Sequence, residues 1–208
     1  MSRFITLEGI EGVGKTSNLE FIRTQIEYSG AECVCTREPG GTRLGEDLRE
    51  ILLSHSEEVM AADAELLLMF AARAQHIEQV IRPNLAAGRY VLCDRFTEAT
   101  YAYQGGGRQI PMHKIAELEQ WVQGELRPDL TIVLDAPVRI GRDRAGRRSA
   151  PDRIEKEKDE FFERVRASYL EMAEHYPHRF AVIDASEHLE AVQSQIRSVL
   201  IEHDILTQ

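Results

Sequence analysis

The chain has 208 residues, a length that fits a single domain. Its composition, 43% hydrophobic and 29% charged, is that of a globular protein able to bury a core. A net charge of −10 argues against broad electrostatic binding to nucleic acid or to an anionic membrane. No apolar run reaches the roughly 18 residues of a membrane span, and the first residues carry no targeting signal, so we expect a cytoplasmic protein.

Five apolar runs of strand length are separated by stretches with helical spacing. The expected strands are residues 4–7, 32–36, 89–93, 130–134 and 179–183, and the expected helices are residues 15–28, 47–54, 63–81, 111–123, 155–175 and 189–201. Apolar strands alternating with helices predict a parallel sheet covered on both faces. We therefore expect one three-layer α/β domain over residues 1–208, a five-stranded parallel sheet flanked by helices. The glycines at 105–107 are expected in a loop.

The three cysteines predict buried thiols. Cys33 and Cys35 alternate in an expected strand and so point to the same face, and Cys93 lies in another apolar run. Small core residues fit this pattern better than a zinc site or a disulfide does. Free thiols agree with a reducing cytoplasm.

The strongest motif joins the first strand to the first helix. Residues 9–16 match G-x-x-x-x-G-K-[ST] and consist of Gly9, Ile10, Glu11, Gly12, Val13, Gly14, Lys15 and Thr16. Backbone N–H groups of such a loop surround phosphate oxygens, and the helix N-terminus adds its positive dipole end. Lys15 is expected to reach the β- and γ-phosphates, with the Thr16 hydroxyl on Mg²⁺. The alternative is a glycine-rich turn without a ligand.

Two further segments follow strands. Asp94 and Arg95 end the third expected strand, which places a carboxylate and a guanidinium beside the phosphate loop, for Mg²⁺ and for phosphate oxygens respectively. The alternative for this pair is a surface salt bridge. Residues 36–42, TREPGGT, let the backbone approach a ligand closely. The alternative there is a turn in which Arg37 and Glu38 form an ion pair.

The charge is concentrated in one segment. Residues 139–153, called the lid segment below, carry six arginines and two aspartates, a local charge of +4 in an otherwise acidic chain. The chain has no N/T-K-x-D tetrad, the usual guanine reader of switch GTPases. Transfer between phosphates needs charge gathered around the transferred group and exclusion of water, which an arginine-rich lid provides. A small kinase is favoured over two alternatives, a deoxynucleoside kinase and a P-loop ATPase switch without an acceptor.

The motifs together, in this order, resemble the thymidylate kinases of the bacterial type. They are the phosphate loop, TREPGGT, Asp94–Phe96, the YAYQGGGR run at 101–108, RPDLT at 127–131 and DRIE at 152–155. The resemblance implies a P-loop nucleotide kinase fold that transfers the γ-phosphate of ATP to dTMP, giving dTDP and ADP. It also implies Mg²⁺, a cytoplasmic homodimer, and neither nucleic acid nor membrane as a partner.

The resemblance assigns roles residue by residue. Catalytic roles fall to Lys15, Arg95, Arg148 and Glu11; ATP contacts to residues 9–16 with Arg144 and Arg147; the metal to Thr16 and Asp94; and dTMP contacts to Glu11, Arg37, Arg49, Met69, Phe70, Arg73, Arg95, Thr100, Tyr103 and Gln104. Glu11 is expected at the sugar 3′-hydroxyl and Arg73 at the edge of the base. Tyr103 under the sugar would reject a 2′-hydroxyl by steric clash.

The chain departs from the family pattern at the base. Related sequences commonly show Phe-x-x-x-Arg, whereas Phe70 precedes Arg73 by three residues and alignment puts Met69 at the stacking position. Either Met69 covers the base, or the helix turns enough for Phe70 to do so. Phe70 as a filler of the helix core is the third possibility.

The second position of difference is Gly12. Some relatives place an arginine there, and those with glycine supply the basic group from the lid. Arg148 is therefore the first candidate for the catalytic lid arginine, with Arg144 and Arg147 behind it. The alternative is a solvated helix face with Arg–Asp pairs three residues apart.

Overall fold

A computed structural model describes residues 3–55, 58–146 and 152–206. Its sheet has five strands, all parallel, in the order β2-β3-β1-β4-β5. The strands are β1 (Phe4–Glu8), β2 (Cys33–Arg37), β3 (Tyr90–Asp94), β4 (Leu130–Asp135) and β5 (Phe180–Asp184). The predicted five-stranded parallel sheet is confirmed. Because β1 is central, the loop that leaves it lies in the middle of the sheet's carboxyl edge.

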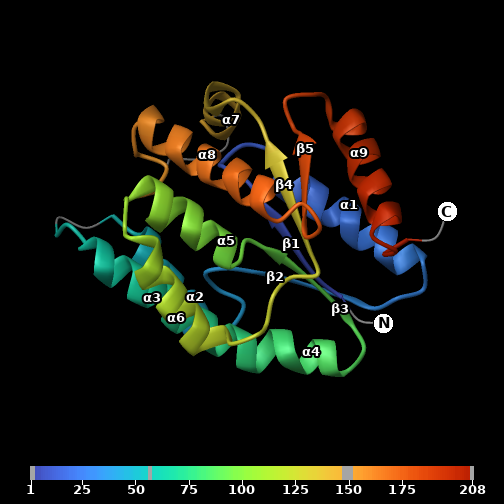
Figure 1. Cartoon of the computed structure of the whole chain (residues 1–208), viewed down its shortest axis with the longest axis horizontal. Coiled ribbons are helices and arrows are strands. Elements are labelled where there is room, and N and C mark those ends of the chain that lie inside the picture. The colour runs from blue at the N-terminus through green and yellow to red at the C-terminus, as the bar shows by residue number, and fades with distance from the viewer. Residues whose placement is uncertain (1–2, 56–57, 147–151, 207–208) are drawn as a thin grey trace.

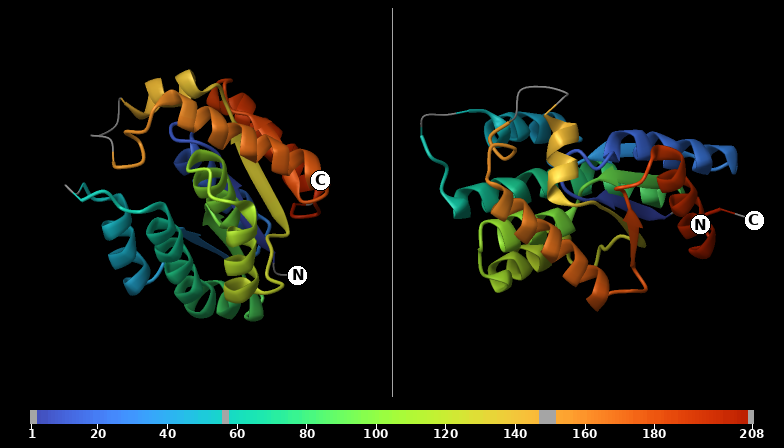
Figure 2. Two further views of the ribbon diagram at one scale, coloured as in Figure 1. Left: turned by 60° about the vertical axis from the view of Figure 1, so that its left-hand side comes forward. Right: turned by 90° about the horizontal axis from the view of Figure 1, so that it is seen from above.

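Helices cover both faces of the sheet. They are α1 (Lys15–Tyr28), α2 (Arg43–Leu53), α3 (Ala62–His76), α4 (Arg82–Ala86), α5 (Thr97–Thr100), α6 (Met112–Gln123), α7 (Val138–Ala145), α8 (Asp159–His175) and α9 (Leu189–Glu202), with π-helical segments η1 (Ile77–Ile81) and η2 (Tyr101–Gly107). Helices α1 and α9 pack together on one face, and α4 and α8 contact the other (Figure 1). Figure 2 shows the same layers from two further directions.

Side-chain alternation along β1 fixes the two faces. Ile5 is buried in the cluster that also contains Ile22 of α1. Phe4, one residue earlier, belongs instead to a cluster with Ile77 and Ile81 of η1. Successive residues of a strand point to opposite faces, so one apolar strand binds both helical layers to the sheet.

The glycine run is helical, and the predicted loop at 105–107 is wrong. The run ends η2, which packs along α8. A Cβ on Gly106 would lie 2.1 Å from the Ser168 Oγ, and one on Gly107 would lie 2.4 Å from the Phe161 ring. The glycines thus serve close packing between η2 and α8 rather than a turn.

Other helix predictions differ in detail. The expected helix 63–81 is α3 continued by η1, and the helix expected from residue 155 begins at Asp159. Helices α4, α5 and α7 were not predicted, because all three are short and their apolar residues do not set a clear helical period.

The cysteine prediction holds only in part. Cys93 is buried in β3, as expected, but Cys33 is half-buried and Cys35 is exposed. Their strand, β2, is the edge strand of the sheet, so one of its sides has no neighbouring strand to cover it. All three thiols are free.

Candidate functional site

The phosphate loop leaves β1 and ends at the first turn of α1. Gly14 precedes Lys15 with φ 93°, a left-handed conformation that favours glycine. The Lys15 ammonium donates to the carbonyls of Gly9 and Ile10, at 3.1 and 2.9 Å. Burial, followed by the charge of Arg95, lowers the pKa of Lys15 to about 8. An anion in the loop would favour the charged ammonium, so this lysine is poised for a phosphate.

Asp94 and Arg95 lie beside the loop, as the sequence predicts. Asp94 is the register partner of Leu7 in β1, and the Arg95 N–H donates to the Leu7 carbonyl at 3.1 Å. The Asp94 Oδ1 atom is buried and has no hydrogen-bond partner among the described residues. Thr16 lines the same groove as Asp94. A buried carboxylate oxygen without a donor, near a hydroxyl, fits a hard cation.

Arg95 is held in an unusual backbone conformation. Its φ is 68°, in the left-handed region that costs a non-glycine residue about 1–2 kcal/mol. The next N–H, that of Phe96, donates to the buried Glu8 carboxylate at 2.7 Å. The guanidinium donates to Glu11 at 2.8 Å and to the hydroxyl of Tyr103 at 2.9 Å. The strained backbone therefore aims this cation along the phosphate loop.

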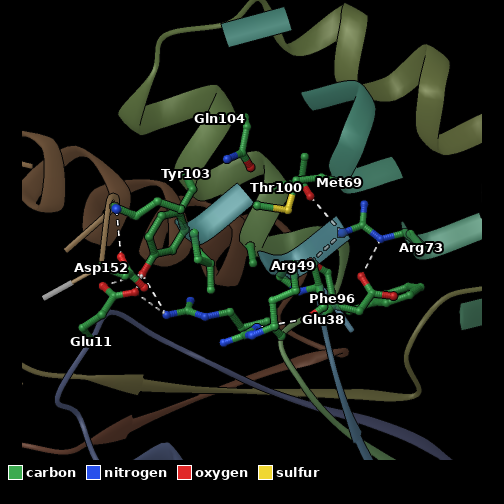
Figure 3. A pocket seen from close by; sticks show the side chains of 15 residues that line it. Glu11, Glu38, Arg49, Met69, Arg73, Phe96, Thr100, Tyr103, Gln104 and Asp152 are labelled. Carbon is green, nitrogen blue, oxygen red and sulfur yellow. Dashed lines mark hydrogen bonds and ion pairs between the residues drawn. The ribbon is translucent and has the colours of Figure 1, made fainter. Parts of the chain in front are cut away.

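A cavity opens next to Arg95 (Figure 3). Its lining consists of Glu11, Glu38, Pro39, Arg49, Leu53, Met69, Arg73, Arg95, Phe96, Ala99, Thr100, Tyr103, Gln104, Asp152 and Ile154. Figure 3 shows Arg73 and Met69 toward one end and Glu11 and Tyr103 toward the other. The structure thus brings together most of the residues expected to contact dTMP.

Arg73 lies at the same end of the cavity as Met69 (Figure 3). Its Nε donates to Glu38 at 2.7 Å, and its Nη2 donates to the Thr100 hydroxyl at 2.9 Å. The Nη1 atom is buried and has no partner among the described residues. A fixed guanidinium with one unused donor can recognise an acceptor atom of a ligand.

Two arginines expected at the acceptor phosphate are separated. Arg49 lines the cavity and donates to the Pro39 carbonyl at 2.9 Å. Arg37 does not line it, and pairs with Glu46 at 2.7 Å across an exposed surface. Glu38 pairs with Arg73 rather than with Arg37, so the alternative of an Arg37–Glu38 ion pair is wrong.

Met69 and Phe70 take different environments. Met69 lines the cavity, whereas Phe70 is 2% exposed in a cluster with Leu66, Ile110 and Ile115. The structure therefore places Phe70 in the core beside α3, outside the lining of the cavity and with the centre of its ring 4.7 Å from the Arg73 guanidinium carbon. Met69, not Phe70, is the one of the two whose side chain lines the cavity.

The described part of the lid segment is bound to the protein body. Arg144 donates to the carbonyls of Ala185 and Ser186, after β5, at 2.8 and 3.2 Å. Arg142 pairs with Asp159 at 3.0 Å, and Arg153 pairs with Glu65 at 2.6 Å. The predictions for Arg147 and Arg148 fall outside the described residues. Solvated Arg–Asp pairing within one helix face does not describe these contacts.

Gly12 joins the phosphate loop to α7. A Cβ on Gly12 would lie 1.8 Å from the Gly141 carbonyl oxygen, and one on Gly141 would lie 2.5 Å from the Glu11 carbonyl oxygen. The two backbones touch because both residues lack a side chain. An arginine at position 12 would require α7 to move away.

Several functional residues escaped the sequence analysis. They are Glu8, Glu38, Glu65 and Tyr169, all buried and all hydrogen-bonded to residues of the site or its support. Burial of Glu8, then the charge of Glu98, raises the pKa of Glu8 to about 8. The signal that could have found Glu8 is a carboxylate within an otherwise apolar strand.

Among the described residues, no three His, Cys, Asp or Glu side chains gather as a protein-built metal centre requires. Within the same residues, no helix is long and apolar enough to cross a membrane.

Comparison with known proteins adds four findings. The family model of thymidylate kinase matches residues 7–196. The thymidylate kinase of Pseudomonas putida (strain W619) is 58% identical over 197 residues, 95% of each chain. That of Pseudomonas entomophila (strain L48) is 58% identical over 95% of this chain and 94% of its own. The crystal structure of thymidylate kinase from Ehrlichia chaffeensis superposes with a TM-score of 0.76 at 33% identity, over 96% of this chain and 98% of that one.

Proposed function

Because this chain belongs to the thymidylate kinase family, we propose that the cavity beside Arg95 binds dTMP while the phosphate loop binds ATP. The γ-phosphoryl group passes from ATP to a phosphate oxygen of dTMP, and the products are dTDP and ADP. The acceptor oxygen is already anionic, so the site needs concentrated positive charge rather than a strong base.

The observation that carries this proposal is that Lys15 of the loop and Arg49 of the cavity donate to backbone carbonyls and, among the described residues, form no ion pair with a carboxylate. The pKa of Arg49 is lowered by burial and then by the positive charges of Arg37 and Arg95. The pKa of Lys15 is also lowered, by burial and then by the charge of Arg95. Cations whose pKa is lowered by burial and by neighbouring positive charge are stabilised in the charged form when an anion binds beside them. The phosphate of a nucleoside monophosphate, reaching toward the phosphate loop, provides that charge.

The residues around the phosphate loop, where the phosphoryl donor would bind, fit ATP and Mg²⁺. Lys15 and the backbone of residues 9–16 hold the ATP phosphates, and Arg144 of α7 is fixed by hydrogen bonds to the loop after β5. Thr16 and the unpartnered Oδ1 of Asp94 would hold Mg²⁺. When bound, the ion neutralises charge on the phosphate oxygens. Arg95 spans the gap between donor and acceptor, and we assign it the charge that develops during transfer.

The cavity fits the nucleoside of dTMP. The Arg73 Nη1 donor and Gln104 lie at the end reserved for the base, together with the Thr100 hydroxyl. Tyr103 donates its hydroxyl to Glu11 at 2.8 Å, so the two form one wall where the sugar would lie. Glu11 keeps acceptor capacity for a sugar hydroxyl, and the Tyr103 ring leaves little room for a 2′-hydroxyl.

Met69 should contribute to dTMP binding, whereas Phe70 should contribute to folding. We expect Met69→Ala to raise the KM for dTMP about tenfold, since the base loses one apolar face worth about 1–1.5 kcal/mol. Phe70→Leu is the matched control, and should lower the free energy of unfolding by about 1–2 kcal/mol with KM unchanged. Steady-state kinetics and thermal denaturation of both variants measure these effects. If Phe70→Leu raised the KM for dTMP and Met69→Ala did not, Phe70 would be the residue that covers the base.

A homodimer and a cytoplasmic location complete the proposal. Leu67 of α3 and Trp121 of α6 are 55% and 83% exposed, and α3 packs along α6. Exposed apolar side chains on two helices in contact favour an interface, and a second copy of this chain is the partner that the family resemblance indicates. The three free thiols support a reducing compartment.

The acceptor specificity tests the function directly. ADP release from ATP and Mg²⁺ is measured with dTMP, dUMP, UMP, thymidine or no acceptor. We expect rapid release with dTMP, far slower release with UMP, and only background release with thymidine or without acceptor. Strong release without an acceptor would indicate an ATPase switch, and release with thymidine a nucleoside kinase.

A further inference from the structure

A buried carboxylate on α3 lies behind the base end of the cavity. The Glu65 side chain is 2% exposed, and it is not among the residues that line the cavity. It accepts hydrogen bonds from three different side chains. Gln104 Nε2 donates to its Oε1 at 2.8 Å, Arg153 donates to its Oε2 at 2.6 Å, and Arg108 donates to Oε1 at 3.3 Å and to Oε2 at 3.4 Å.

The donors around Glu65 keep it ionised. Burial by itself would raise the pKa of this carboxyl, but the hydrogen bond from Gln104 and the charges of Arg108 and Arg153 outweigh it, and the pKa lies below its ordinary value. An ionised carboxylate only accepts hydrogen bonds. It must therefore face the amide nitrogen of Gln104, because the amide oxygen in that place would meet another acceptor.

The orientation of Gln104 decides what the cavity offers a base. With Nε2 engaged by Glu65, Oε1 remains as an acceptor, and no described residue donates to it. Arg73 offers the complementary donor, since its buried Nη1 has no partner among the described residues. Figure 3 shows both side chains at this cavity. The site thus presents one donor and one acceptor in fixed places.

We propose that Glu65 is a positioning residue that sets base specificity: it locks the Gln104 amide so that the cavity accepts a 4-oxo pyrimidine monophosphate and rejects a 4-amino one. This inference rests on the proposed function. Thymine and uracil present an O4 acceptor and an N3–H donor, which match Arg73 and Gln104. Cytosine presents a 4-amino donor and an unprotonated N3 acceptor, so both contacts are mismatched and the buried groups stay unpaired.

The substitution Glu65→Gln should reverse the orientation of the Gln104 side-chain amide. Glutamine has a single oxygen, and the cations Arg108 and Arg153 favour that oxygen on their side. Its amide NH₂ then faces Gln104, which must turn its own oxygen toward residue 65 and its NH₂ toward the cavity. Arg73 and Gln104 would then both offer donors to the base, a pattern that suits the N3 acceptor of cytosine better than the N3–H of thymine.

The experiment compares kcat/KM for dTMP and dCMP on the same enzyme preparation, so that the ratio is independent of the folded fraction. We expect the wild-type ratio to be at least about a thousandfold in favour of dTMP, and Glu65→Gln to lower it at least about a hundredfold. Glu157→Gln is the matched control. Glu157 pairs with Arg108 in the same network but does not touch Gln104, so the ratio should stay at the wild-type value.

Each outcome separates the two proposals. A wild-type enzyme that does not use dTMP overturns the proposed function. A wild-type enzyme that prefers dTMP, with an unchanged ratio in Glu65→Gln, overturns the role of Glu65 alone. If Glu65→Gln does not fold, NMR of the wild-type protein tests whether Glu65 holds the Gln104 amide. The Gln104 side-chain amide protons, assigned by their loss in Gln104→Met, should be protected from solvent exchange without ligand, and rapid exchange would overturn the inference.

Discussion

Replacing Arg95 by lysine is expected to lower kcat at least about a thousandfold, with a much smaller rise in the KM for dTMP. Removal of one preorganised cation from a phosphoryl-transfer site costs about 10³–10⁵ in kcat. Lysine keeps the charge but cannot reproduce the geometry. The guanidinium donates to Glu11, Tyr103 and Tyr169 at once, and an ammonium on a flexible stem cannot hold that arrangement.

The Arg95 prediction is measured by steady-state and single-turnover kinetics with ATP and dTMP. Arg197→Lys is the matched control, since Arg197 lies on α9 and donates to Gln25 on an exposed surface. Its kcat should equal that of the wild type. A kcat for Arg95→Lys within about threefold of the wild type would mean that any local cation suffices, and that the strained backbone at Arg95 does not serve catalysis.

Gly12→Ala is expected to impair both stability and turnover. Its Cβ would lie 1.8 Å from the Gly141 carbonyl oxygen and 2.7 Å from the Gly141 carbonyl carbon, and the residue has φ 76°. The left-handed backbone costs alanine about 1 kcal/mol, and overpacking costs a further 1–3 kcal/mol. At this chain length each kcal/mol lowers Tm by about 2–4 °C, so we expect a loss of about 4–16 °C. The shift of α7 also moves Arg144, and kcat should fall at least about tenfold.

Gly30→Ala separates backbone strain from contact with α7. Gly30 has φ 87°, and a Cβ there meets nothing within 4 Å among the described residues. Its cost is therefore the left-handed conformation alone, about 1 kcal/mol, and its kcat should be unchanged. Thermal denaturation and kinetics of the two variants are compared directly. Equal losses in both would show that α7 yields freely and that the Gly12–Gly141 contact does not position the lid segment.

The sequence predicted the sheet and the ends of its strands because those features depend on local patterns. Apolar runs bounded by glycine and charge identify strands regardless of what packs on them. Once the strands are parallel, the phosphate loop after β1 and Asp94–Arg95 after β3 must meet at one edge. Arg95 and Lys15 could therefore be found from the sequence.

The buried carboxylates could not be found in this way. Glu8, Glu38 and Glu65 receive donors from elements 35 to 161 residues away in the chain. No local period distinguishes them from solvated acids. The prediction of a loop at residues 105–107 was wrong for the same reason, since these glycines pack against α8, which is distant in the sequence. Likewise, the rotation of α3 decides that Met69 lines the cavity and Phe70 packs in the core, and the sequence of the helix leaves that rotation open.

The sequence by itself determined that an acidic chain carries a phosphate loop and one segment of local charge +4. Only the tertiary structure decided where that charge goes. Arg153 is neutralised by Glu65 and Arg142 by Asp159, so part of the excess fastens the lid segment instead of facing a ligand. The net charge of a segment is the sum over its residues and can be read from the sequence. The electrostatic effect of those charges at a site depends on which oppositely charged side chains the fold brings within about 4 Å. Those side chains are distant in the sequence, so only the tertiary structure identifies them.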